Sequence, residues 1–241
     1  MKITANLMHF KELNEKVRNT PEKSVEIDNC IGQRYIASGL SNKDIVINGT
    51  PGNALGAYLN GANVTVYGNA QDATGDTMND GSITIHGSSG DATGYAMRGG
   101  KIFVRDNAGY RAGIHMKAYK EKIPKLVIGG AAGSFLGEYQ AGGVIVVLGI
   151  NNTTGKAPVG RFCGTGMHGG KIYICSENEP ENLPAQVAVR KAESEDMNEI
   201  EDILREYCDN FNYDPAKIIN KTFYVLTPNT KNPYKRLYTN N

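Results

Sequence analysis

Three glycines are spaced as in the phosphate-binding loops of dinucleotide-binding proteins. Gly164, Gly166 and Gly169 match the pattern G-x-G-x-x-G, in which backbone N–H groups at a helix start hold a pyrophosphate. That chemistry requires a strand before the loop and a helix after it. Here residues 171–174 read as a strand, so the glycines are better explained as turn residues than as a nucleotide site.

Cysteine and histidine side chains are the next candidates, as metal ligands or nucleophiles. His168 lies close in sequence to two of the four cysteines, but no close pair of ligands typical of zinc or iron–sulfur sites is present. The cysteines are scattered: Cys30, Cys163, Cys175 and Cys208. We therefore expect reduced thiols in the core and a cytoplasmic protein. His86 and His115 stand alone, without a nucleophile and base of an activated triad.

Charged side chains allow two further readings. Asp72 and Asp91 are 19 residues apart and would stack as neighbours in a repeat. Such a pair could perform acid–base chemistry or bind a cation, although aspartates in glycine turns usually accept hydrogen bonds from local N–H groups. Four arginines could line a face that binds an anion or an acidic partner: Arg98, Arg105, Arg111 and Arg161. The simpler interpretation is that these side chains are solvated surface charges. We assign no catalytic, cofactor-binding or metal-binding residue and expect no cofactor.

The elements that would position these residues follow a repeat of 19 residues. Gly56, Gly75, Gly94 and Gly113 have this spacing, and the unit returns at Gly137 and Gly164. Each unit carries an apolar-x-apolar triplet, and the triplets begin at Ile45, Val64, Ile83, Ile102, Leu126, Ile145 and Ile172. Five extra residues lie within 117–125. Three residues after each glycine stand Leu59, Met78, Met97, Met116, Gln140 and Met167.

A short strand followed by glycine turns in each unit predicts an all-β, single-stranded parallel β-helix from about residue 45 to 175. The spacing does not give its hand, but parallel crossovers are generally right-handed, so we expect a right-handed parallel β-helix. The first triplet residues should stack as one interior ladder. We expect residues 1–44 to form an N-terminal helix and cap, with Leu7, Phe10, Leu13 and Val17 on one helix face. Residues 176–241 should form a helical tail, with a helix that starts at Ser194 and an extended segment at 223–226. A second, short helix should begin at Asp214-Pro215, with Asp214 as its cap and Pro215 in its first turn.

The middle residues of the triplets should point outward. Phe103, Val127, Val146 and Tyr173 then form an apolar strip, part of which the tail could cover through Ile200, Leu204 and Tyr207. Solvated faces rarely carry such a strip, so we expect the remainder to bind another subunit. On this reading, lysine at Val127 and Val146 should leave the fold intact and abolish assembly.

Composition excludes some classes of protein. The chain has 241 residues and a net charge of +1, from 26 Lys+Arg against 25 Asp+Glu, which makes nucleic acid an unexpected partner. No run approaches the roughly 20 apolar residues of a membrane span. The first residues contain Lys2, His9 and Lys11, so we expect no signal peptide.

The repeat and its flanks resemble the GXGXG β-helix domain at the C-terminal end of the glutamate synthase large subunit. The resemblance begins near residues 28–32 and is strongest in Gly49-Thr50-Pro51-Gly52-Asn53 through Gly68, in residues 141–149 and in residues 164–170. The tail is also similar, at residues 197–208, 216–219 and 223–228 and at Tyr234-Lys235. One of the subunits of formylmethanofuran dehydrogenase carries a similar GXGXG solenoid, whereas the tail favours glutamate synthase.

The resemblance implies a non-catalytic scaffold subunit that organises partner catalytic subunits, an amidotransferase and an FMN-binding synthase, or else a homo-oligomer. It carries no catalytic residue onto this chain, because Lys2 follows Met1 where the family's amidotransferase has an N-terminal cysteine. We expect the isolated chain to bind no flavin and to turn over neither glutamine nor 2-oxoglutarate. A carbohydrate-binding or carbohydrate-acting β-helix is the alternative from another class.

Overall fold

The computed structural model describes residues 1–229 and consists mainly of strands. The strands are β1 (Lys2–Thr4), β2 (Ser24–Ile31), β3 (Asp44–Thr50), β4 (Asn60–Tyr67), β5 (Asp80–Ile85), β6 (Lys101–Val104), β7 (Lys125–Ile128), β8 (Ala141–Val147), β9 (Gly169–Cys175), β10 (Val187–Lys191) and β11 (Phe223–Pro228). The helices are α1 (Phe10–Asn19), α2 (Ser194–Phe211) and α3 (Ala216–Ile219). None of these helices has the length and apolar composition to cross a membrane.

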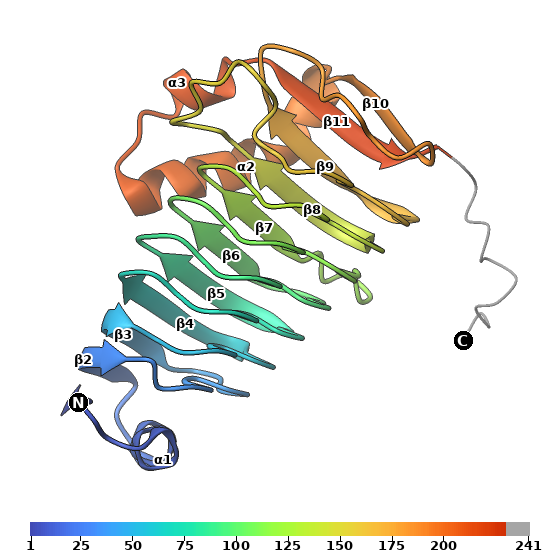
Figure 1. Cartoon of the computed structure of the whole chain (residues 1–241). Coiled ribbons are helices and arrows are strands. Elements are labelled where there is room, and N and C mark those ends of the chain that lie inside the picture. Colours follow the sequence, from blue (N-terminus) through green and yellow to red (C-terminus); the bar gives the residue numbers. More distant parts are fainter. Residues whose placement is uncertain (230–241) are drawn as a thin grey trace, which may run out of the picture.

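All eleven strands belong to one open sheet in the order β1-β2-β3-β4-β5-β6-β7-β8-β9-β11-β10 (Figure 1). Neighbours from β1 to β9 are parallel and follow the order of the chain. The last two additions, β11 on β9 and β10 on β11, are antiparallel. The prediction of a strand-dominated chain with stacked parallel strands and few helices is therefore confirmed.

The interior ladder is confirmed residue by residue. Val64 pairs with Ile83, and Ile83 pairs with Ile102. The row continues through Leu126, Ile145 and Ile172, and the exposed fraction of each of these side chains is 1% or less. The ladder also extends further toward the N-terminus than Ile45, because Val25 of β2 pairs with Ile45. Glycine spacing could not reveal this strand, since its unit lacks the regular glycines.

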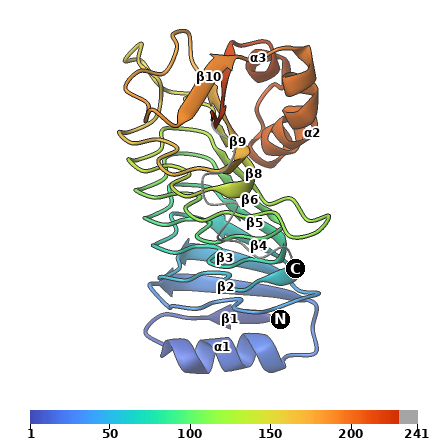
Figure 2. The ribbon, with the colours of Figure 1, turned by 90° about the vertical axis from the view of Figure 1, so that its right-hand side faces the viewer.

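The turns form a second layer against the sheet. Between consecutive strands the chain loops away to one side and returns (Figures 1 and 2). The residues that stand three positions after the repeat glycines pack in the same core as the ladder: Leu59, Met78, Met97, Met116 and Met167. Gln140, which interrupts this row, is also fully buried, and its Nε2 donates to the Gly143 carbonyl at 3.1 Å. A polar residue fits in the row because its N–H groups reach backbone acceptors.

Helix α1 covers the N-terminal end of the stack (Figure 2). Leu13 and Val17 are buried in the core, as the helical spacing predicts. The prediction that Leu7 shares this face is wrong: the helix begins at Phe10, and Leu7 precedes it with 91% of its surface exposed. Met8 packs against the core instead.

The C-terminal segment closes the other edge of the sheet with β11 and β10. The extended segment is confirmed as β11 and the short helix as α3. The helix begins one residue later than predicted, with Pro215 as its N-cap, although Asp214 Oδ1 accepts the Ala216 N–H at 3.0 Å. Helix α2 starts at Ser194, as predicted, and Glu193 is its N-cap. The reason is Asp196, which accepts the Glu193 N–H at 2.9 Å and binds the Arg190 guanidinium. The basic and aromatic end, with Tyr234 and Lys235, lies outside the described residues.

The apolar strip lies entirely under helix α2. Phe103, Val127, Val146 and Tyr173 have no exposed surface and form one cluster with helix residues that include Ile200, Leu204 and Tyr207. Tyr207 also donates its hydroxyl hydrogen to the Arg105 carbonyl at 3.1 Å. The expectation that this strip binds another subunit is therefore wrong. The chain itself provides the cover.

Lysine at Val127 and Val146 should now destabilise the protein, contrary to the expectation from the sequence. Each ammonium group would be placed beneath α2 without a partner, and an unpaired buried charge costs about 3–5 kcal/mol. We expect a matching fall in the free energy of unfolding, measured by urea titration and circular dichroism. Thr65→Lys is the control, because Thr65 occupies the same outward position on β4 and is only half-buried. A double variant as stable as the parent would contradict the packing of α2.

Candidate functional site

Asp72 and Asp91 each bind a backbone N–H of the next repeat. The Oδ1 atom of Asp72 accepts the Asp91 N–H at 2.9 Å, and the Oδ1 atom of Asp91 accepts the Tyr110 N–H at 2.8 Å. Asn53 occupies the same column one unit earlier and accepts the Asp72 N–H at 3.3 Å. The carboxylates do accept backbone N–H groups, as predicted, but from the next repeat and not from their own turn. These carboxylates are stacked, but they connect repeats and do not form an acid–base pair.

Glycines beside the column allow the carboxylates to approach the turns. A Cβ atom at Gly90 would lie 2.2 Å from Asp72 Oδ1 and 2.9 Å from the Asp72 nitrogen. At Gly109 the same atom would lie 2.2 Å from Asp91 Oδ1. Real Cβ atoms do not approach oxygen this closely, so any side chain here would displace the capping group.

Gly90→Ala should therefore destabilise the stack by about 1–3 kcal/mol, the usual cost of overpacking. We expect a lower urea midpoint at unchanged slope. Adding Asp72→Ala to this variant should restore little, because backbone atoms of residues 71 and 72 also lie 2.9 Å from the new Cβ position. Gln71→Ala, an exposed neighbour, serves as the control and should be neutral. Wild-type stability of Gly90→Ala would show that the turn is looser than described.

Two of the dinucleotide-like glycines, Gly164 and Gly166, lie in the last turn before β9, and the third, Gly169, is the first residue of β9. The loop that they form leads directly into this strand, as the sequence predicts, and no helix N-terminus faces it. A Cβ atom at Gly166 would lie 2.5 Å from the Tyr139 ring, and one at Gly164 would lie 3.0 Å from Val187. Close packing against these side chains accounts for the two glycines. The nucleotide interpretation has no structural support here.

The Cys163, His168 and Cys175 side chains are not assembled into a metal site. Among the described residues, no group of three or more His, Cys, Asp or Glu is placed to hold an ion. The four cysteines are free and buried. Burial raises the pKa of Cys163 to about 12 and also raises the pKa of Cys175, where the Lys221 charge partly opposes the shift. The Nδ1 atom of His168 lies 3.2 Å from the Gly166 carbonyl oxygen.

The two other candidate histidines, His86 and His115, stack with aromatic rings. His86 lies 4.6 Å from Tyr67 and 5.0 Å from Phe211, centroid to centroid, and so connects the sheet to the end of α2. Its pKa is lowered, mainly by burial and further by the Arg105 charge. His115 stacks on Tyr139 at 5.2 Å. Both rings therefore have packing roles.

The four arginines have different surroundings. Arg105 pairs with Asp106 at 2.9 Å, below the end of α2. Arg111 pairs with Glu138 at 3.3 Å and lies over the Phe135 ring. Arg98 and Arg161 are exposed, and in the described part of the chain their side chains make no ion pair. A single face lined by all four is not formed.

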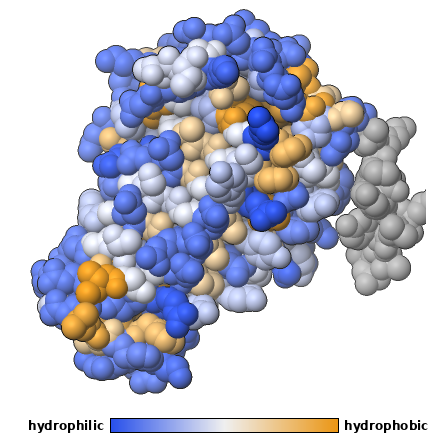
Figure 3. Space-filling view, in the orientation of Figure 1, coloured by the Kyte–Doolittle hydropathy of each residue, from blue (hydrophilic) through white to orange (hydrophobic). Residues whose placement is uncertain are grey.

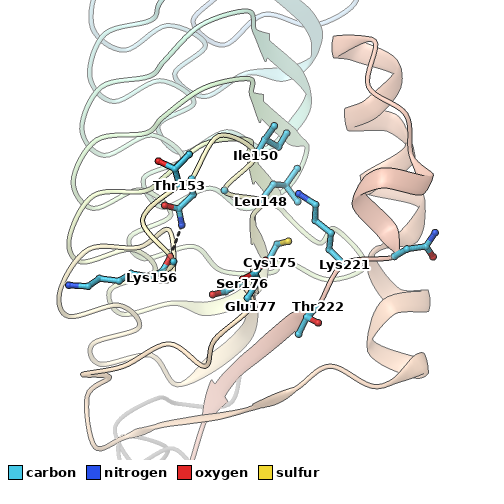
Figure 4. Close-up of a pocket in the computed structure, with 13 residues that line it drawn as sticks. Leu148, Ile150, Thr153, Lys156, Cys175, Ser176, Glu177, Lys221 and Thr222 are labelled. Carbon is cyan, nitrogen blue, oxygen red and sulfur yellow. Dashed lines mark hydrogen bonds between the residues drawn. The ribbon is translucent and has the colours of Figure 1, made fainter.

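A cleft that the sequence analysis missed lies beside Cys175 (Figure 4). Its volume is about 580 Å³. Three segments line it, namely residues 148–156 after β8, residues 175–177 at the end of β9, and residues 220–222 after α3. The Ser176 N–H donates to the Thr222 carbonyl at 3.1 Å, and Asn178 Nδ2 donates to the Gly155 carbonyl at 3.1 Å. These bonds hold the walls together.

The cleft is polar, with both charge signs at its wall. Figure 4 shows the Lys221 side chain running toward Leu148, whereas Lys156 points away. Glu177, Ser176 and Thr153 supply oxygen atoms. No hydrogen bond joins a candidate nucleophile to a base here, so the arrangement suits a small polar ligand better than covalent chemistry. The signal in the sequence was the spacing of 27 from Gly137 to Gly164, which is eight more than the repeat.

Stacked units that each supply one strand and one glycine turn define a β-rich repeat protein, in which every unit packs on its neighbours. The model of the family described as "GXGXG motif" matches residues 4–231. This chain therefore belongs to the GXGXG motif family.

The proteins that are similar to the chain include the following two. The first is an uncharacterized protein of Methanocaldococcus jannaschii, MJ1350, which is 46% identical over 250 aligned residues that cover 98% of this chain and 95% of the relative. The second is a chain from the formyltransferase/hydrolase complex FhcABCD of Methylorubrum extorquens, solved in complex with methylofuran. It aligns with a TM-score of 0.65 at 20% identity, covering 84% of this chain and 72% of that one, which shows a shared fold.

The buried thiols should be nearly inert in the native protein. Burial raises the pKa of Cys30 to about 11 and that of Cys163 to about 12. Little thiolate is therefore present at pH 8. We expect slow labelling by iodoacetamide before unfolding and complete labelling in guanidinium, followed by mass spectrometry. Cys175, with 8% of its surface exposed, should react first, and Cys175→Ser should remove this phase. Rapid labelling of native Cys163 would contradict its burial.

Proposed function

We propose that this chain is a non-catalytic scaffold subunit that fixes partner catalytic subunits relative to one another. The observation that carries the proposal is the use of its polar turn residues: Asp72, Asp91 and Asn53 all bind the neighbouring repeat. We further propose that the successive strand-and-turn units are coils of a right-handed parallel β-helix. Parallel crossover connections are almost always right-handed, which supports this hand.

The partners that we propose are an amidotransferase and an FMN-binding synthase in a glutamate synthase-like complex. The support is the resemblance of residues 49–68, 141–149 and 164–170 to the glutamate synthase domain, together with membership of the GXGXG family. The confirmed helix and strand of the tail, α2 and β11, correspond to the segments that favour this family. Self-association into a homo-oligomer is the second arrangement.

A second candidate is a scaffold like the GXGXG subunit of formylmethanofuran dehydrogenase. The specific observation in its favour is the similarity in fold to a chain of the FhcABCD complex. In either case we propose no catalytic, cofactor or metal residue in this chain and no binding to nucleic acid or membrane. The four free thiols support a reducing, cytoplasmic compartment.

Purification of the tagged chain from its native cells tests the proposal. We expect defined partners in fixed stoichiometry, identified by mass spectrometry, with glutamine-dependent formation of glutamate from 2-oxoglutarate in the purified complex. When the partners are dissociated, flavin should leave with them, and the isolated chain should be colourless and inactive. Formyl transfer to a methanofuran-type acceptor would favour the second candidate. A monomeric chain without partners, or a yellow isolated chain, would refute the scaffold proposal.

A further inference from the structure

A hairpin finger interrupts the regular repeat between β6 and β7. Its five extra residues lie between Met116 and Leu126, and Tyr119 and Lys122 exchange two backbone hydrogen bonds of 3.0 Å. The Lys122 ammonium group reaches back to Asp80 Oδ2 at 2.7 Å, more than one unit earlier in the stack. Other units close in 19 residues, for example from Ile83 to Ile102 and from Leu126 to Ile145, so the stack does not require this finger. Insertions in repeat proteins often lie on the binding face.

The finger forms one wall of a pocket of about 400 Å³. Three stacked residues form the floor: Asn60, Asn79 and Arg98 occupy the same position in consecutive units. Their stacking follows from the backbone, because the Asn79 N–H donates to the Leu59 carbonyl and the Arg98 N–H donates to the Met78 carbonyl, both at 2.8 Å. The side walls are Tyr58 on one unit and Tyr119 with Lys122 on the finger.

The polar groups on the floor are free to bind an external acceptor. Within residues 1–229, the side chains of Asn60, Asn79 and Arg98 make no hydrogen bond or ion pair, in contrast to the capping Asn53. The Lys122 ammonium group differs from these three side chains, because it already forms an ion pair with Asp80. A guanidinium group with neighbouring carboxamide N–H donors suits a carboxylate, which it can bind through two parallel hydrogen bonds.

Charge and exposure indicate that this carboxylate belongs to a polypeptide. The finger and its surroundings carry four cations, Arg98, Lys117, Lys120 and Lys122, against Asp80 and Glu121. The pocket is open, with 56% of Tyr58 and 54% of Tyr119 exposed, whereas small ligands are usually enclosed by their sites. Tyrosine and arginine are enriched at protein interfaces. The face seen in Figure 3 is mostly hydrophilic with separate small apolar areas.

We propose that this pocket receives an Asp or Glu side chain from an acidic segment of a partner subunit. The proposal rests on the scaffold function, for which it names a docking point and the chemistry of the partner. Arg98 binds the carboxylate, Asn60 and Asn79 donate to it, and the two tyrosines cover its stem.

The test compares tagged Arg98→Glu and wild-type chains expressed in the native host, after the wild-type partners have been identified. We expect recovery of the docked partner to fall at least about tenfold, because two negative charges would face each other. Lys217→Glu makes the same charge change on α3 and should retain the partner in full. Thermal melting should show that both variants are folded. Full recovery with Arg98→Glu would overturn the docking point.

A cross-link identifies the partner's chemistry directly. Arg98→Lys keeps the positive charge and supplies an amine, so carbodiimide treatment should join residue 98 to an Asp or Glu of the partner. Absence of this link in an intact complex would overturn the carboxylate assignment.

Sodium succinate, titrated calorimetrically into the isolated chain, should not bind. Binding that is lost in Arg98→Gln would show a site for a free carboxylate instead. If wild-type chain recovers no partner at all, the scaffold function itself fails, which is a distinguishable result.

Discussion

In-register stacking of parallel strands is the constraint on which the rest of the structure depends. Each repeat presents its apolar row to the same row of the next, so that Ile83 lies between Val64 and Ile102 along the sheet. A single unit has too little area to bury these side chains alone. The turns must keep the same register as the strands. Asp72 and Asp91 enforce this by binding the N–H of the equivalent position one unit on.

Stacking also creates two open edges and an outer face, and the flanking segments cover them. Unpaired strand edges invite pairing with other chains, and here α1 covers the first end while β11 and β10 extend the last. The outer edge is the short β10, which ends in Arg190 and Lys191. Helix α2 packs on the apolar part of the outer face, and the bidentate contact of Arg190 with Asp196 fixes its start to β10. The tail is therefore part of the fold.

The repeat made the ladder predictable from sequence, whereas the full extent of the cover by the flanking segments was not. A period of 19 fixes which residues are equivalent, and equivalence is enough to pair Ile83 with Ile102. It gives no information on strands without glycine units, such as β2 and β10. It also identifies Val127 as outward without showing what lies over it, because an intramolecular helix and a partner subunit demand the same apolar residues. Because Asp72 lies in a regular unit, its role in the turns was predictable. The cleft beside Cys175 was not, because it lies at an insertion that departs from the period.

Regular units and insertions use their polar side chains differently, the first for stability and the second for recognition. Where the spacing is 19, polar side chains bind neighbouring units and glycines permit close approach, so little capacity for ligands remains. Where the chain inserts five or eight residues, the added loops create concave surfaces whose polar groups are free, as at Arg98, or shared between segments, as at Ser176. The regular stack holds these surfaces at fixed separations along one axis. This geometry is what the proposed scaffold function requires, and a change in the length of one insertion would alter one of these surfaces while leaving the register of the stack unchanged.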